Sequence, residues 1–288
     1  MALVVDNDVN VGSGLTAGIS TCTLGSGGGA TTMNITKGSI VIALVGCNRT
    51  PAQGSFAKVI SITGGGLTFV RRKQLQVHHL GGAGGERYSD TEIWWAYASS
   101  NQTNVALIAT TDLVTDGTTF IAFGVTGFQG TYYQTHPWDD DVSVPAVKNC
   151  TIQDPPVSEV PSIIFNANGG ILPSPTLSFE FMQYSATSGS TSGGFTQGRI
   201  QGNTAGSLSC AVEFAYKYNS RPSHLNPGFT NSIQAWQIIG DSLMENPLVV
   251  GGSSGPGINS TASAEKTWLY NKKLMKKYTD LQLKIYKR

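Results

Sequence analysis

Residues 61–72 read SITGGGLTFVRR, and after a glycine-rich loop residues 90–98 read DTEIWWAYA. Side chains alternate between the two faces of a β-strand, so Trp94 and Trp95 point to opposite sides. Both faces of the second segment are mostly apolar, which predicts a strand that is covered on both sides. The adjacent tryptophans bring a large area to a core. Residues 64–66, all glycine, suit a corner with positive φ or a close approach of another strand.

The rest of the chain up to residue 250 reads as short strands separated by Gly- and Pro-rich turns. Residues 40–47, IVIALVGC, form a nearly continuous apolar run that is typical of a central strand. A turn is expected at 112–117 and a long Pro-rich excursion, with one strand inside 142–152, at 129–161. The fold class predicted is all-β, an antiparallel β-sandwich or jelly roll of ten to fourteen strands. The other strands are expected at 21–24, 31–36, 55–63, 104–110, 119–128, 162–167, 176–182, 207–218 and 232–239.

Four segments are expected along the chain: N-terminal strands or an arm (1–36), the β-sandwich (37–250), a flexible linker (251–262) and a C-terminal basic arm (263–288). Residues 264–288 hold eight Lys or Arg and two acidic residues, a net charge of +6, against −5 for residues 1–263. Apolar residues in the arm repeat with the period of an amphipathic helix, although 281–285 also alternates like a strand. The arm is expected to pack on its own body or on another subunit. The candidate partner-binding residues are Trp268, Leu274, Tyr278, Leu281, Ile285, Lys272 and Lys276.

The composition points to a surface with few charges. Charged residues make up 13% of the chain, against roughly 25% in an ordinary soluble domain. Such a surface can pack against copies of itself with little desolvation cost, so a homo-oligomer is expected. No signal peptide is expected, because residues 1–6 lack a basic start and a long apolar run, and no apolar run is long enough for a membrane helix. The cysteines, Cys22, Cys47, Cys150 and Cys210, are scattered and are expected to be small buried side chains rather than metal ligands.

Two matches to nucleotide-binding and hydrolase motifs fail on their context. Residues 25–30, GSGGGA, fit a dinucleotide fingerprint, but a strand-like segment follows instead of a helix. Residues 251–255, GGSSG, fit a nucleophile elbow, but Pro256 blocks the required helix and no histidine follows. No cofactor is therefore expected.

Histidines and carboxylates supply the remaining candidates for chemistry. His136 with the acidic run 139–141 is expected to be a solvated loop rather than a cation site. His78 and His79 point to opposite faces, one buried and one exposed. Glycoside hydrolysis would need two facing carboxylates. Three glutamates in apolar strands leave that alternative open, namely Glu92, Glu180 and Glu213.

Three aromatic residues lie in the Pro-rich excursion. Tyr132, Tyr133 and Trp138 are candidate glycan contacts, or they fill a subunit interface. Burial under the loop itself is an equal alternative.

Four segments resemble a β-sandwich family met in virion proteins of tailed bacteriophages. The family patterns are a KGDxLVV strand, a GGGLTW corner, a TxEIWxA strand and a VxAFSG strand. This chain differs at Ser39 and Phe69, where Asp and Trp are more usual, and in its basic arm. The matching segments are 37–43, 59–70, 91–97 and 120–127.

The resemblance implies a fold and a setting rather than a site. It implies a non-enzymatic structural protein of a virion, made in the host cytoplasm, on the head as a capsid decoration or on the tail, and held by its terminal arms. Its partners would be other virion proteins, rather than nucleic acid or a membrane. The alternative is a carbohydrate-binding host-adsorption module that contacts a host surface glycan. A glycan-degrading enzyme is the third hypothesis.

Overall fold

The computed structural model describes residues 2–6, 10–14, 19–24, 32–80, 86–150, 159–167, 174–184, 192–201, 210–229 and 235–246, with backbone alone at 10–14 and 19. All of them belong to one compact unit, Met1–Leu248. The second unit, Val249–Arg288, and with it the predicted linker and arm, lies outside the described residues. Within the described ranges every regular element is a strand, apart from the short 3-10 turns η1 (Pro51–Gln53) and η2 (Tyr132–Gln134). No helix in that part of the chain is long and apolar enough to cross a membrane.

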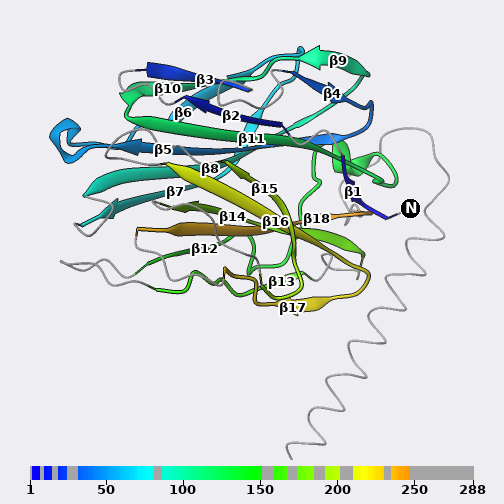
Figure 1. Ribbon diagram of the computed structural model, residues 1–288. Coiled ribbons are helices and arrows are strands. Elements are labelled where there is room, and N and C mark those ends of the chain that lie inside the picture. Colours follow the sequence, from blue (N-terminus) through cyan, green and yellow to red (C-terminus); the bar gives the residue numbers. More distant parts are fainter. Residues whose placement is uncertain are drawn as a thin grey trace, which may run out of the picture. The chain divides into compact units, whose positions relative to one another are not determined.

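The middle of the molecule is an antiparallel sheet in which β5 lies between β11 and β8 (Figure 1). All ten residues of β5 are buried. Its even-numbered residues, such as Ile42, enter one core and its odd-numbered ones, such as Val41, enter another. Burial on both faces explains the continuous apolar run in the sequence. The strands of this sheet are β1 (Val4–Val5), β2 (Asn10–Gly14), β5 (Ile40–Arg49), β7 (Val70–His79), β8 (Arg87–Tyr97) and β11 (Gly117–Thr126).

A smaller layer covers the face of the middle sheet that carries Val41, Trp94 and Phe120. It contains a three-stranded sheet in the order β3-β10-β6 and a separate β4-β9 pair. Its apolar residues, among them Leu24 and Leu107, complete this second core. The strands are β3 (Ile19–Thr23), β4 (Met33–Ile35), β6 (Val59–Thr63), β9 (Gln102–Val105) and β10 (Ile108–Thr115).

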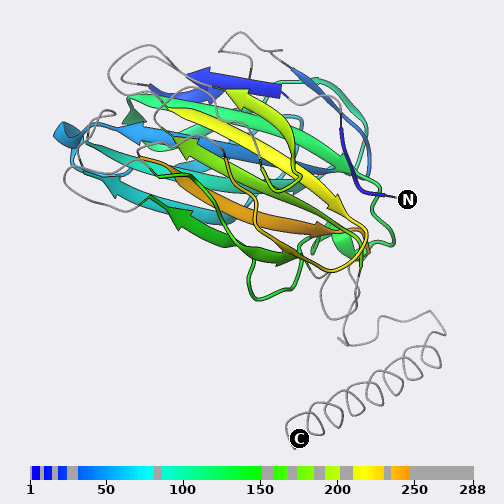
Figure 2. The same cartoon turned by 60° about the horizontal axis from the view of Figure 1, so that its bottom comes forward.

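A five-stranded sheet in the order β12-β18-β14-β16-β15 covers the opposite face (Figures 1 and 2). Phe123 of the middle sheet stacks on Phe214 of this sheet, with ring centroids 4.4 Å apart. The outer face of the five-stranded sheet packs in turn on the β13-β17 pair through a third core around Phe165 and Trp236. The strands are β12 (Ala146–Asn149), β13 (Phe165–Ala167), β14 (Thr176–Tyr184), β15 (Thr196–Gln201), β16 (Ala211–Asn219), β17 (Ser223–Leu225) and β18 (Gln237–Met244).

The predicted all-β class and the antiparallel sandwich are confirmed, and the sandwich is repeated so that β-layers lie on both sides of the middle sheet. The two tryptophans face opposite cores as predicted, Trp94 in the second and Trp95 against the first. The glycine corner is also confirmed. Gly64 has a φ of +140°, and a Cβ there would lie 2.1 Å from the carbonyl oxygen of Ala106, so no larger residue fits without movement.

The turn predicted at 112–117 is wrong for most of its length. β10 continues through Thr115, because the backbone N–H of Asp112 donates to the carbonyl of Lys58 at 2.9 Å. The Asp112 carboxylate accepts the N–H of Lys58 at 2.8 Å. Asp112 therefore joins β10 to the segment before β6, and the chain turns only at Asp116.

Candidate functional site

Glu92 on β8 is completely buried and joins the middle sheet to β6 of the smaller layer. Its Oε1 accepts the backbone N–H of Val59, the first residue of β6, at 2.9 Å, and the Nε2 amide of Gln74 at 3.2 Å. Its Oε2 accepts the indole N–H of Trp94 at 2.7 Å and lies 3.5 Å from Arg71. The carboxylate thus accepts a backbone N–H from the edge strand β6, which explains why an acidic side chain lies in this core. It is not open to a substrate.

Asp90 lies two residues before Glu92 on the same face of β8 and is also buried. Gln74 donates to its Oδ1 at 2.8 Å. Burial, together with the neighbouring Glu92, raises the pKa of Asp90 to about 9. Asp90 is therefore protonated at neutral pH.

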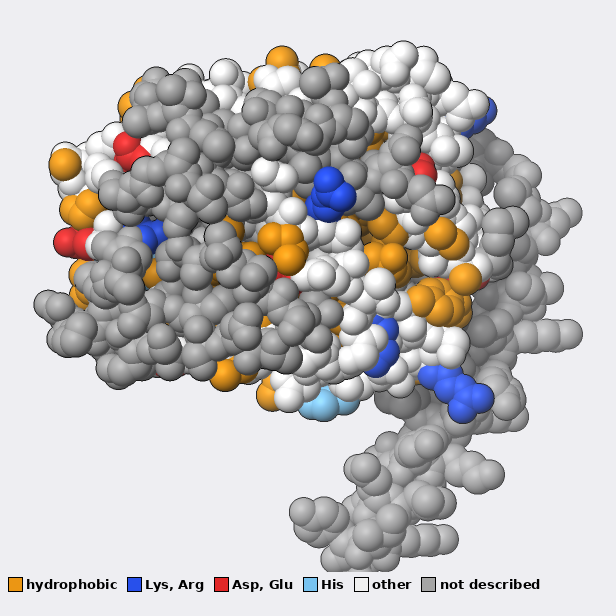
Figure 3. Space-filling model, viewed as in Figure 1, with side chains coloured by type: hydrophobic (Ala, Val, Ile, Leu, Met, Phe, Trp, Pro, Cys, Tyr) orange, Lys and Arg blue, Asp and Glu red, His pale blue; other side chains and the backbone are white. Residues whose placement is uncertain are grey.

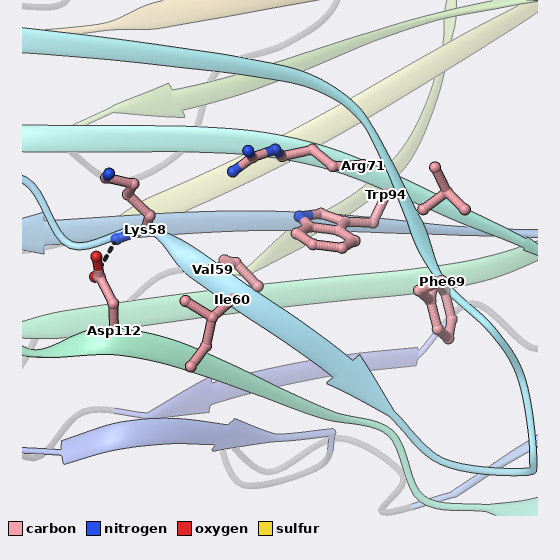
Figure 4. Close-up of a pocket in the computed structure, with 8 residues that line it drawn as sticks. Lys58, Val59, Ile60, Phe69, Arg71, Trp94 and Asp112 are labelled. Carbon is pink, nitrogen blue, oxygen red and sulfur yellow. Dashed lines mark hydrogen bonds between the residues drawn. The ribbon is translucent and has the colours of Figure 1, made fainter.

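A groove of about 450 Å³ opens beside this carboxyl pair, between β6 and the strands β7 and β8 (Figure 4). Trp94, 8% exposed, lies inside it, with Phe69 toward one end and the side chains of Lys58 and Arg71 toward the other. The Arg71 guanidinium lies over the Trp94 ring, 5.7 Å from its centroid, an attractive cation–π contact. The full lining is Lys58, Val59, Ile60, Phe69, Val70, Arg71, Trp94 and Asp112.

The groove has the features of a binding surface. Its volume lies within the range of small-ligand sites, which are mostly apolar with a few polar groups. Two of its aliphatic side chains are unusually open to solvent, Ile60 at 59% and Val70 at 52%. The Asp112 carboxylate, which also lines the groove, accepts the backbone N–H of Lys58, and the Lys58 ammonium makes no ion pair within the described ranges. Sequence patterns did not identify this site, because its residues come from four strands, β6, β7, β8 and β10, which only the fold brings together.

A buried ion pair joins the edge of the middle sheet to the five-stranded sheet. The Arg72 Nε donates to Asp241 Oδ2 at 2.9 Å, and its Nη2 donates to Oδ1 at 3.3 Å. The guanidinium also lies over the ring of Trp138, 4.7 Å from its centroid. Burial raises the pKa of Asp241, and Arg72 opposes that rise. This two-pronged contact is structural.

A second tie between the same two sheets consists of neutral polar side chains. Thr91 donates to Gln183 Oε1 at 2.5 Å, and Gln237 donates to both Thr91 and Gln183. Gln183 donates in turn to the carbonyl of Cys47 at 3.0 Å and to Asn48 at 2.8 Å. Buried networks of this kind fix one arrangement of the layers.

Glu180 and Glu213 are brought close together on the outer face of the five-stranded sheet. Glu180 pairs with Ala215, and Glu213 pairs with Met182, so the two carboxyls are diagonal neighbours on adjacent strands. Both residues are fully buried. Burial, and then the charge of Glu213, raises the pKa of Glu180 well above its usual range. Gln197 donates to Glu213, whereas neither oxygen of Glu180 contacts a donor in the described part of the chain. The pair lies in a closed core, not at a cleft that admits a polysaccharide.

The histidine pair lies as expected, with one residue inside and one toward solvent. His79 is buried, and its Nδ1 lies 3.4 Å from the Sγ of Cys150. Burial, with Arg87 nearby, lowers the pKa of His79 to about 3, while burial raises the pKa of Cys150. A neutral imidazole beside a neutral thiol is not an activated nucleophile. His78 is half-buried, pairs with Glu86 at 2.7 Å and stacks on Tyr88.

All four cysteines are buried thiols, as predicted. Burial raises the pKa of Cys210 to about 12, and it raises the pKa of Cys47 as well. Because the thiolate is the reactive form, we expect no labelling by 5,5′-dithiobis(2-nitrobenzoic acid) in the folded protein and labelling of all four thiols in denaturant. Rapid modification of one thiol under native conditions would contradict the burial described.

His136 and the acidic run 139–141 do not converge on one point. His136 is exposed and stacks on Tyr132, with ring centroids 4.6 Å apart. Asp139 is buried and its backbone N–H donates to the carbonyl of Ser242, so the predicted solvated loop is wrong at this residue. Asp141 instead accepts the N–H of Ser143 at 2.9 Å, a local turn. No cluster of three or more possible metal ligands occurs in the described ranges.

The three aromatic residues proposed as glycan contacts divide between surface and core. Trp138 is buried against Trp95 and Phe179, and Tyr133 is buried against Phe128 and Tyr97. Burial was one of the alternatives that the sequence left open for these two residues. Because they are buried, they offer little ring surface to a sugar. Tyr132 is half-buried. The predicted partner-binding residues of the arm, Trp268, Leu274, Tyr278, Leu281, Ile285, Lys272 and Lys276, lie outside the described residues.

Comparisons with protein-family models, with curated proteins and with solved structures found no match for this chain.

Proposed function

We propose that this chain is a non-enzymatic structural protein of a tailed-phage virion, a β-sandwich module displayed on the head or tail. One observation carries the proposal. The segments that resemble phage virion proteins lie in β5, β8 and β11 of the middle sheet and in β6 with the glycine corner, where they pack the layers together. β5, β8 and β11 supply apolar side chains to two cores at once. Motif residues whose side chains pack between layers are typical of a structural scaffold.

Charged side chains in and next to these segments support the same role. Glu92 bonds to the edge of β6 and to Trp94, and Arg72 bonds to Asp241 of the opposite sheet. These groups tie layers together instead of lining an open site. Where Figure 3 colours the surface by residue type, the charged side chains are scattered among apolar and uncharged polar ones. A surface of this kind is suited to close packing against neighbouring proteins.

The proposal is tested by the protein composition of purified particles. Virions from the source of this chain should contain it at a fixed number of copies relative to the major capsid protein, measured by mass spectrometry with labelled standard peptides. Supplying the chain without residues 258–288 to particles that lack it should reduce its incorporation, if the arm holds it there. A chain that accumulates in infected cells and is absent from particles would contradict the structural role.

A further inference from the structure

We propose that the groove over Trp94 binds a segment of a partner polypeptide in which an acidic residue lies beside a bulky apolar one. The groove has two chemically different ends. In Figure 4 the amino and guanidinium groups of Lys58 and Arg71 lie toward one end, and the ring of Phe69 lies toward the other, with Trp94 between them. A ligand that fills both ends has a negative group and an apolar group a few ångströms apart.

The cationic end is prepared for a carboxylate. Arg71 is held at its place by the Trp94 ring and by a long contact of 3.5 Å to Glu92, yet its side chain is 40% exposed. The Glu92 carboxylate already accepts three shorter bonds, from Val59, Trp94 and Gln74. The guanidinium therefore keeps N–H donors for an outside partner, in the planar geometry that matches a carboxylate. Lys58 adds a second, exposed positive charge, and the Asp112 carboxylate at the same end accepts the backbone N–H of Lys58.

The apolar end favours a protein over a saccharide. Ile60 and Val70 line the groove and are each more than half exposed, and Phe69, which also lines it, is half-buried. Branched aliphatic side chains remove water from sugar hydroxyls without replacing their hydrogen bonds, whereas they pack well on Leu, Ile or Phe. Trp94 is also too deeply buried to serve as a flat stacking platform, and its N–H is bonded to Glu92. Charge and shape thus point to an acidic, apolar peptide.

The inference goes beyond the proposed role by assigning a contact surface to it, and it can fail while the chain is still found in particles. The probe is a random linear peptide library displayed on filamentous phage and selected on the immobilised full-length chain. We expect enriched sequences with Asp or Glu within three positions of Phe, Trp, Leu or Ile. Synthetic peptides of the consensus should lose about tenfold in affinity, measured by isothermal titration calorimetry, with the Arg71→Gln or Ile60→Ser variant.

Two matched variants control for general effects of lost charge and lost apolar surface. Arg221→Gln removes an exposed cation from the turn after β16, and Val147→Ser removes an exposed aliphatic side chain from β12, and neither should change the affinity. Lys58→Gln, an exposed position, repeats the charge test without disturbing Glu92. An enriched consensus that ignores Arg71, Lys58 and Ile60, or no consensus at all, would overturn the inference. Binding of oligogalacturonate with loss in the same variants would replace the polypeptide by an acidic saccharide.

Discussion

Replacing Arg72 by leucine is expected to lower the free energy of unfolding by about 3–5 kcal/mol, the range found when one partner of a buried ion pair is removed. Asp241 is fully buried, and Arg72 is the cation that pairs with its carboxylate. Without Arg72, the negative charge of Asp241 would be left without an ion-pair partner in the described part of the chain. The guanidinium also covers the ring of Trp138, so packing is lost together with charge. Urea unfolding followed by tryptophan fluorescence measures the change.

The neighbouring arginine supplies the matched control. Arg71 pairs with Glu92 at the longer distance of 3.5 Å and is 40% exposed, whereas the Arg72 side chain is 23% exposed. Arg71→Leu should therefore cost about 1 kcal/mol or less. In the double variant Arg72→Leu with Asp241→Leu, most of the lost stability should return, because no buried charge remains. Equal losses for both arginines would show that the two sheets are not tied at Asp241.

Replacing Glu180 by methionine is expected to stabilise the protein at alkaline pH, by about 1–3 kcal/mol, the usual cost of a buried polar group without a partner. Methionine has a similar length and no charge, and the site lies among apolar residues on the outer face of the five-stranded sheet. The effect should be smaller at acidic pH, where the carboxyl is mostly neutral in both the folded and the unfolded chain. Unfolding curves at about pH 4 and about pH 8 separate the two conditions.

The sign of this pH dependence follows from the direction of the pKa shifts. Burial raises the pKa of Glu180, Asp90 and Asp241 above their values in the unfolded chain. The folded state therefore holds these protons more tightly, and its stability falls as the pH rises from about 4 through the folded pKa, which for Asp90 is about 9. Glu180→Met should flatten this fall, whereas Asp140→Asn, at an exposed carboxylate, should leave it unchanged. A slope that is the same in wild type and Glu180→Met would contradict a buried, neutral Glu180.

Local patterns were enough to predict the central strands of the middle sheet, β5, β8 and β11. The apolar run of β5, the alternation around Trp94 and Trp95 and the three glycines of the corner each leave a signature within a few residues. The turn at 112–117 was wrong because Asp and Gly favour turns, while the bond between Asp112 and Lys58 depends on a strand more than fifty residues away. Long-range strand pairing of this kind overrides the local turn propensity of these residues.

The side-chain contacts between layers and the groove were harder to predict, because the residues that form them are distant in sequence. Arg72 and Asp241 are 169 positions apart, and no local sequence pattern near either residue predicts that they form an ion pair. Trp138 lies in a Pro-rich segment that reads as surface, yet Trp95 and Phe179 from two other sheets enclose it. The groove is likewise lined by side chains from four strands. Glu92, Glu180 and Glu213 were identified as unusual charges in apolar strands, but only the structure shows that all three are closed from solvent.

The central claim is that the middle sheet is sealed on both faces and forms the rigid part on which the molecule is built. Hydrogen–deuterium exchange of the native full-length chain, read by mass spectrometry, tests it most directly. The account predicts that peptides from β5, β8 and β11 exchange last and only through global unfolding, while the edge strands β6 and β12 exchange earlier. Exchange of β5 at the rate of those edge strands would show that one of its faces is open, and would contradict the account.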